Sequence, residues 1–248
     1  MNRLPAALLA CATLATSTVA TGQASADGLY VGYYQEDPLT NPEDPTMGSV
    51  YLSLPAGDSA FSGTMSFTYV GCQGEGAGAV SGAKSGAALK GTWSGTVDGH
   101  PQNGAFAGAW TKESGGYVGT YDVAGGKQHV DVPSCISYFI APNGSWELFP
   151  VGTGEPANFA VTVVGHEIRW TPPAGVVMTL VYVLDPELAK TAAGHAAKWQ
   201  TLVFGPGKHA ADFRLAGLQP GHAYVAAVGT ADGSLKRTAF ASKTFVAP

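Results

Sequence analysis

The stretch "LKGTWSGTVDGHPQNGAFAGAWTKESGGYVGTYD", from Leu89 to Asp122, repeats one short pattern three times. In each copy a bulky apolar residue is followed two positions later by Gly, and two positions after that by an aromatic residue. Residues at steps of two share one face of a β-strand. The positions between them, such as Lys90, Thr92 and Ser94, are small or polar. The pattern therefore predicts strands with one face of rings and glycines and one wettable face.

Two further copies, Tyr30-x-Gly32-x-Tyr34 and Phe61-x-Gly63-x-Met65, extend the pattern toward the N-terminus. Gly weakens a strand, but repeated on one face it opens slots that rings on neighbouring strands can fill, and it lets the sheet coil. Turns rich in Gly, Pro and Asp separate the runs. We predict an all-β domain over residues 27–150, a barrel or sandwich of eight to ten antiparallel strands, mostly a meander. In composition it resembles small calycin-type barrels, a resemblance that assigns no ligand residue.

The first 26 residues predict an export signal. Arg3 precedes the apolar run "LPAALLACATLA", and "ASA" at 24–26 is a small-residue cleavage site. The mature chain would then begin near Asp27 and be secreted or periplasmic. The alternative is a lipoprotein anchored through Cys11, because "LLAC" resembles a lipobox. No later segment approaches the ~18 continuous apolar residues of a membrane span, so we expect no transmembrane segment in the mature chain.

The amino-acid composition of the chain argues against some classes of protein. The chain has 248 residues, of which 45% are hydrophobic and 12% charged, with a net charge of −5. The apolar content argues against disorder, and the lack of excess Lys and Arg argues against nucleic-acid binding. With Cys11 removed, Cys72 and Cys135 remain, and an oxidising compartment favours a disulfide between them.

A second set of motifs follows the Gly- and Pro-containing segment at 151–156. "NFAVTVVGHEIRWTPPAG" places Trp170 before a Pro-Pro turn, "TLVYVLD" is a β-rich run, and "GLQPGHAY" ends at Tyr224. These motifs resemble a fibronectin type III domain over residues 156–248. The resemblance implies a β-sandwich with Trp170 and Leu218 in its core and a turn at Pro220. It also implies a tyrosine corner, in which the Tyr224 hydroxyl bonds back to the chain a few residues upstream.

The segment from Asp185 to Trp199 departs from that family because it is long and rich in Ala. Asp185 suits the N-cap of a helix, and Pro186 suits its first position. We therefore expect a short helix inserted in the sandwich.

The candidate binding residues are the rings of the first domain: Trp93, Trp110, Tyr117 and Tyr121. They either fill the core or line a cup or platform for sugar rings or an apolar ligand. The acid-rich segment at 35–45 is more typical of a solvated loop than of a Ca²⁺ site. No spacing of His or Cys residues indicates a metal site. No nucleotide fingerprint or nucleophile motif appears, so we expect no cofactor.

These observations predict an exported, non-catalytic binding or adhesion protein that recognises an extracellular or envelope protein or carbohydrate. Fibronectin type III modules, by resemblance, act as spacers or as binding units for such partners. One alternative is a secreted glycan-acting hydrolase that uses two carboxylates of the first domain, drawn from Asp98, Glu113, Asp122 and Asp131. The other is a structural envelope protein.

Overall fold

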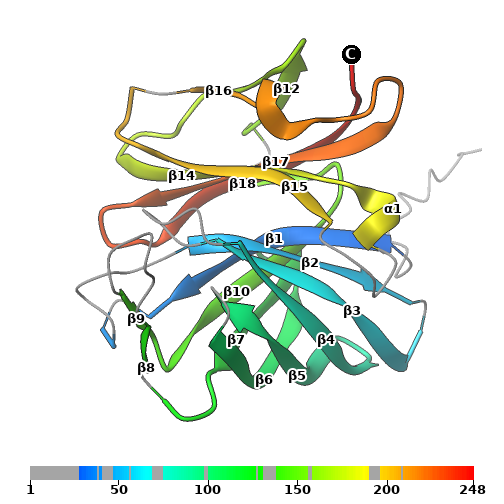
Figure 1. The fold of residues 1–248 in the computed structure, drawn as a ribbon, viewed down its shortest axis with the longest axis vertical. Helices are drawn as coiled ribbons and strands as arrows, with labels where there is room; N and C mark the ends of the chain where they lie inside the picture. Colours follow the sequence, from blue (N-terminus) through cyan, green and yellow to red (C-terminus); the bar gives the residue numbers. More distant parts are fainter. Residues whose placement is uncertain are drawn as a thin grey trace, which may run out of the picture.

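The fold consists of β-sheets in stacked layers (Figure 1). The computed structural model describes residues 28–37, 39–40, 47–55, 57–68, 75–97, 100–126, 128–130, 138–155, 158–189, 196–207 and 209–248. A curled sheet of the N-terminal residues lies below a two-sheet sandwich of the C-terminal residues in Figure 1. The expected all-β class, with an antiparallel first domain and a following sandwich, is confirmed.

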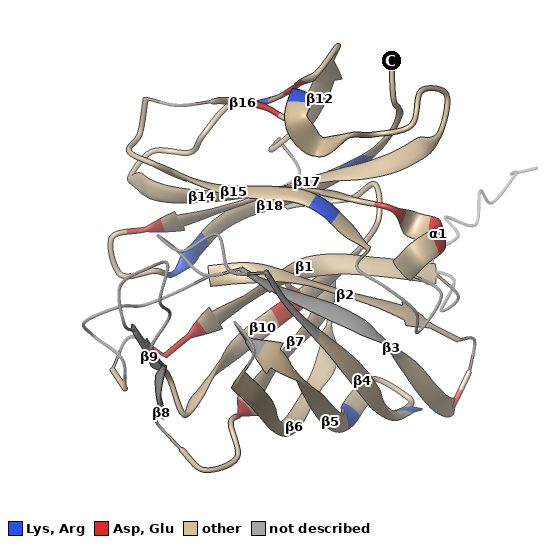
Figure 2. Ribbon diagram, viewed as in Figure 1, with Lys and Arg blue, Asp and Glu red and all other residues tan. Residues whose placement is uncertain are grey.

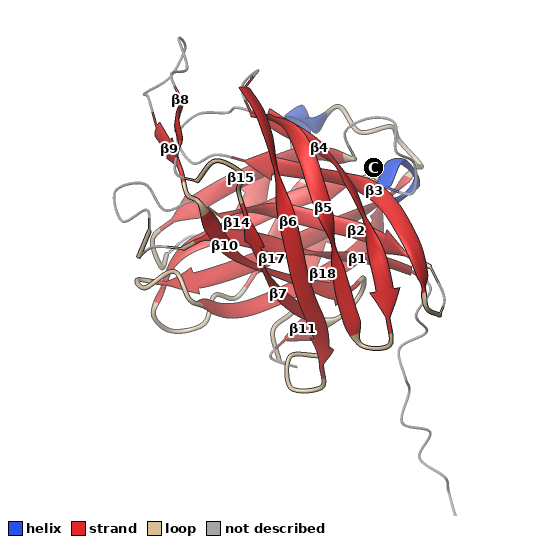
Figure 3. Ribbon diagram, turned by 90° about the horizontal axis from the view of Figure 1, so that it is seen from below, coloured by secondary structure: helices blue, strands red, loops and turns tan. Residues whose placement is uncertain are grey.

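The curled sheet has eight antiparallel strands in the order β2-β1-β10-β7-β6-β5-β4-β3. Their bounds are β1 Gly28–Glu36, β2 Met47–Leu54, β3 Ser59–Thr68, β4 Glu75–Ser85, β5 Ala88–Val97, β6 His100–Thr111, β7 Gly116–Asp122 and β10 Asn143–Pro150. Strands β3 to β7 form the expected meander (Figure 3), but β10 lies between β1 and β7. The sheet curls until its two edge strands, β2 and β3, lie against each other. A separate hairpin comprises β8 Gln128–Val130 and β9 Tyr138–Ile140. We call the eight-stranded unit the barrel.

Rings lie against glycines throughout the barrel, as the sequence pattern predicted. Gly108 and Gly119 face each other on β6 and β7. The ring of Trp146 covers both, since a Cβ added at either glycine would come within 2.6 Å of this indole. Gly91 and Gly82 are covered in the same way by Phe106 and Phe61. Glycine is therefore required at these positions by the rings of neighbouring strands.

The expectation that every strand has a wettable face is wrong for β1 and β2. Nearly every residue of both strands is buried, on both faces. Tyr30 and Tyr34 point into the barrel, whereas Val31 and Tyr33 pack outward against the sandwich. The reason is that the sandwich covers this part of the barrel surface, so the outward positions are apolar as well.

The sandwich consists of a larger and a smaller sheet. The larger has the order β11-β18-β17-β14-β15, with bounds β11 Gly154–Glu155, β14 Val176–Leu184, β15 Ala197–Phe204, β17 Ala223–Asp232 and β18 Arg237–Val246. The smaller has the order β12-β13-β16, with bounds β12 Val161–Val164, β13 Glu167–Trp170 and β16 Ala210–Asp212. A 3-10 helix, η1 Arg214–Ala216, precedes Gly217. Within the expected linker at 151–156, Gly154 and Glu155 pair with β18.

The expected short inserted helix begins where the sequence places it. Helix α1 spans Pro186–Ala189. Its N-cap is Asp185, whose Oδ1 accepts hydrogen bonds from the backbone N–H groups of Glu187 and Leu188 at 3.0 and 3.3 Å. Trp199, at the end of the predicted segment, lies instead in strand β15. The pairing of β15 with β14 therefore overrides the helix propensity at this end of the segment.

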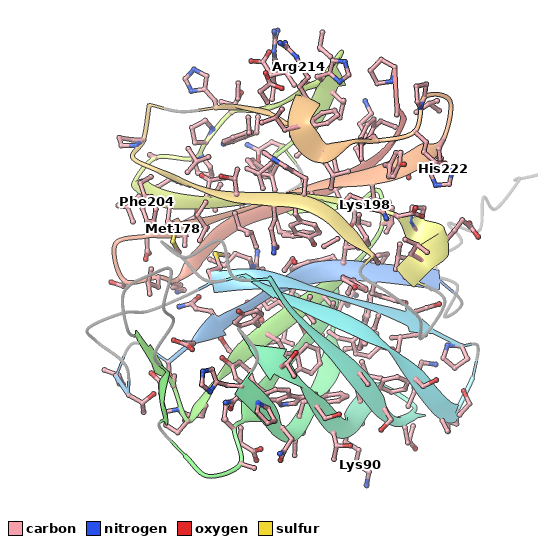
Figure 4. The ribbon with its side chains drawn as sticks, viewed as in Figure 1. Lys90, Met178, Lys198, Phe204, Arg214 and His222 are labelled. Atoms are coloured by element: carbon pink, nitrogen blue, oxygen red, sulfur yellow. The ribbon has the colours of Figure 1, made fainter. Side chains whose placement is uncertain are left out.

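Barrel and sandwich share one buried interface. Apolar side chains of β1, β2 and β10 pack against those of β14, β17 and β18, and Met178 lies between the layers (Figure 4). The Phe149 and Phe240 rings stack at 4.8 Å. The Tyr182 hydroxyl donates a hydrogen bond to the Gly32 carbonyl at 2.8 Å. Because this interface is apolar and closely packed, the two units form one continuous core.

Some predicted features lie outside the described residues. They are the export signal at 1–26, with Cys11 in it, and both Cys72 and Cys135, so the disulfide stays a prediction. No helix within the described ranges has the length and apolar character needed to cross a membrane.

Candidate functional site

The four candidate aromatic residues all point into the barrel. Trp93 and Tyr117 are buried, and Trp110 and Tyr121 pack against the same core. Trp93 and Tyr121 help to line an internal cavity of about 40 Å³, together with Tyr34, Val50, Leu52, Val80, Phe106, Trp146 and Leu148. Ligand pockets usually measure about 300–1,000 Å³. These rings therefore act as core residues around a small apolar void.

The other two candidates lie at the opposite end of the barrel. Trp110 and Tyr117 contact edge to face at 5.3 Å, and Tyr30 completes the group at 5.4 Å from Tyr117 and 6.3 Å from Trp110. Edge-to-face packing of this kind is typical of rings that stabilise a core.

The buried rings place their polar atoms within the barrel wall. The indole nitrogens of Trp93 and Trp146 donate to the backbone carbonyls of Asp122 and Thr120, at 3.1 and 3.0 Å. Burial raises the pKa of Tyr121 well above its usual value, and the nearby charges of Glu36 and Asp37 raise it further. Tyr121 is therefore a neutral phenol near neutral pH.

The residues assigned structural roles lie in the sandwich. Trp170 and Tyr224 are buried in its core, and Leu218 packs against them half-exposed. Pro220 is exposed beside Gly221, which has a positive φ of 78°. The Tyr224 hydroxyl accepts a hydrogen bond from the backbone N–H of Gln219 at 3.1 Å.

A concave site with polar lining lies on the outside of the barrel. It is an open hollow of about 510 Å³ where β1, β7 and β10 have their ends beside the middle of β6. Because Phe106 and Tyr121 point inward, the residues beside them in the strands point outward into the hollow. Its outward-facing side chains are Gln35, Asp37, Ala105, Ala107, Thr120, Asp122, Asn143 and Ser145. We call this site the strand-end hollow.

Two rows of side chains cross the strand-end hollow at right angles to the strands. The first runs from Gln35 through Ser145 and Thr120 to Ala107, which are paired in register. In the second, Asn143 pairs with Asp122. Asp37 and Ala105 flank them, because Asp37 N–H donates to the Asn143 carbonyl and Ala105 N–H donates to Asp122 Oδ1. Neighbouring strands lie ~4.8 Å apart, so each row repeats at about that spacing.

Gln35 is a mostly buried polar residue in the wall of the strand-end hollow. It is 9% exposed, and in the described part of the chain its amide makes no hydrogen bond. Its amide atoms are not among the fully buried polar atoms that lack a partner, so they still reach solvent. The Gln35 amide can therefore bond to a molecule that enters the hollow.

Of the four acids considered for a hydrolase, the structure brings only Asp122 to the strand-end hollow. Glu113 lies in the exposed turn between β6 and β7, and Asp98 and Asp131 fall outside the described residues. Asp37 and Asp122 share the hollow, separated by β10. Within the described ranges no three His, Cys, Asp or Glu side chains gather as metal ligands.

Sequence reasoning missed Gln35, Thr120, Asn143 and Ser145, because each is a small or polar residue near a strand end, as many surface residues are. Only the three-dimensional order of β1, β10 and β7 brings them together. Charged residues are otherwise sparse along the barrel strands (Figure 2). No protein-family model, no curated protein and no solved structure matches this chain.

Proposed function

We propose that this protein is an exported, non-catalytic binding protein that holds an extracellular or envelope ligand in the strand-end hollow. The observation that carries the proposal is the open polar hollow itself, in which Gln35, Thr120 and Ser145 present polar groups side by side without hydrogen bonds among the described residues. Such groups can bond to a ligand without first breaking bonds within the protein.

The rest of the molecule supports a binding role. The internal cavity of the barrel measures about 40 Å³, far below the ~300–1,000 Å³ of ordinary ligand pockets, so it is too small to hold a substrate. The strand-end hollow stands on paired strands rather than on loops, which favours a preformed site. The resemblance of the sandwich to fibronectin type III domains, with β12-β13-β16 beside β18-β17-β14-β15, supports a spacer or second binding unit.

The test compares three proteins on immobilised neutral and acidic oligosaccharides and on immobilised extracellular proteins. Ala107→Trp fills the strand-end hollow, and Ala83→Trp adds the same ring on β4, outside the hollow, where Ala83 is also exposed. We expect the unmodified chain and Ala83→Trp to bind at least one probe that Ala107→Trp does not bind.

Two results would overturn the proposal. One is that every probe binds Ala107→Trp as well as it binds the unmodified chain. The other is that bound oligosaccharide is cleaved, measured as new reducing ends, which would favour the hydrolase.

A further inference from the structure

We infer that the ligand of the strand-end hollow is an uncharged carbohydrate chain, bound through its hydroxyl groups across the two rows of side chains. This inference rests on the proposed function and specifies the class of ligand.

The first argument is the mixture of donors and acceptors in the strand-end hollow. Ser145 and Thr120 offer hydroxyls that have no hydrogen bond among the described residues. Asn143 receives the Thr40 hydroxyl on its Oδ1 at 3.0 Å, which leaves its amide NH₂ as a donor. The Gln35 amide offers one acceptor and two donor hydrogens. Groups that both donate and accept suit hydroxyls, which do the same.

The second argument is the charge of the strand-end hollow. Its charged residues among the described ones are Glu36, Asp37 and Asp122, and all are acidic. One oxygen of Asp37 accepts the Leu39 N–H at 2.9 Å, and one of Asp122 accepts the Ala105 N–H at 2.6 Å. The nearest basic side chain in the first row is Lys90, one strand beyond Ala107 and pointing outward (Figure 4). An anionic ligand would therefore meet repulsion at the centre of the hollow.

The third argument is the floor of the strand-end hollow. Ala105 and Ala107 expose only methyl groups, so a ligand can approach the strands closely over a thin apolar surface. A protein partner usually anchors itself by burying aromatic or other large side chains in a pocket. The aromatic rings nearest the hollow, Phe106 and Tyr121, belong to the barrel core. The hollow thus favours a polyhydroxylated ligand over a protein.

The experiment measures binding of neutral hexasaccharides (malto-, cello-, chito- and manno-) and of hexagalacturonate by calorimetry. The central variant is Thr120→Val, which removes one hydroxyl of the hollow at nearly constant shape. Its matched control is Thr92→Val, at an exposed position on the outer face of β5 outside the hollow. Gln35→Leu removes the amide of Gln35, and circular dichroism checks that each variant is folded.

We expect at least one neutral hexasaccharide to bind. Thr120→Val and Gln35→Leu should weaken that binding by about tenfold, which corresponds to ~1.4 kcal/mol, while Thr92→Val leaves it unchanged. Hexagalacturonate should bind at least tenfold more weakly than the preferred neutral sugar.

The outcomes separate the two proposals. If binding that Ala107→Trp abolishes is confined to hexagalacturonate or to an immobilised protein, the carbohydrate inference is wrong and the proposed function stands. If Thr120→Val and Thr92→Val have equal effects on a bound neutral sugar, the assignment to the two rows is wrong. If Ala107→Trp affects no probe, both proposals are wrong.

Discussion

The Tyr182 hydroxyl of the sandwich donates a hydrogen bond of 2.8 Å to the carbonyl oxygen of Gly32 in the barrel. Both residues are buried in the shared core, where Tyr182 has no exposed surface. The contact joins residues 150 positions apart in the chain, and it couples the folding of the two units.

Tyr182→Phe should lower the free energy of unfolding by about 1–1.5 kcal/mol, because the hydroxyl is lost while the ring is kept. Barrel and sandwich should still unfold in one transition, since the apolar interface around Tyr182 remains. Urea denaturation followed by far-UV circular dichroism and by Trp fluorescence measures both. Two separate transitions in the unmodified protein would contradict the idea of one continuous core.

Gly32→Ala should destabilise the protein by at least about 3 kcal/mol, or roughly 6–12 °C in Tm for a chain of this size. The added Cβ would lie 1.8 Å from the backbone oxygen of Glu147 on β10, and backbone cannot move aside as a side chain can. Gly28→Ala, on the same strand, is the matched control, since a Cβ there meets nothing within 4 Å. Differential scanning calorimetry of the two variants tests whether glycine is required at position 32. Equal melting temperatures of Gly32→Ala and Gly28→Ala would disprove it.

Arg237 and Glu147 form an ion pair, and we expect their contributions to the free energy of unfolding to depend on each other. Arg237 Nε lies 2.5 Å from Glu147 Oε2, both side chains are mostly buried, and the guanidinium lies 5.2 Å from the Phe149 ring centre. Glu147→Gln or Arg237→Met should each cost about 2–3 kcal/mol, because each removes one charge of a mostly buried ion pair. The double variant should cost less than the sum of the two, as a double-mutant cycle by urea denaturation would measure. Strict additivity would mean that the pair is not coupled.

Alkaline pH should destabilise the fold through its buried tyrosines. Burial raises the pKa values of Tyr33, Tyr121 and Tyr182 well above 10 in the folded state. A raised folded-state pKa gives stability that is fully present below pH 10 and is lost as pH rises through the folded-state value. Tyrosinate absorbance at 295 nm should therefore show fewer phenols ionised at pH 11 in native than in urea-unfolded protein. Equal titration curves in the two states would contradict this prediction.

The parts of the fold that depend on local periodicity could be predicted from the sequence. The Gly–aromatic steps around Trp93 and Trp110 predicted strands with rings and glycines on one face, and Gly104 lies against the ring of Trp93 in the barrel. The insertion of β10 between β1 and β7 could not be predicted. The alternation of residues along a strand shows which residues share a face, but not which distant strand pairs with it.

The interface between barrel and sandwich could have been predicted from the sequence of β1. Strand β1 reads "GLYVGYYQE", with apolar residues on both of its faces. A strand that is apolar on both faces is expected to be covered on both sides, and Val31 and Tyr33 are covered by the sandwich. The strand-end hollow had no comparable signal, because residues such as Gln35 and Ser145 become neighbours only after β1 and β10 pair.

The central position of β10 also constrains the order in which the barrel folds. Strands β3 to β7 pair with their neighbours in the chain, whereas β1 must wait for residues 143–150 to find its second partner. Contacts of such long sequence separation form slowly. Strand β1 is therefore completed late, and the apolar surface of β1 and β2 stays open to aggregation until β10 has paired with β1.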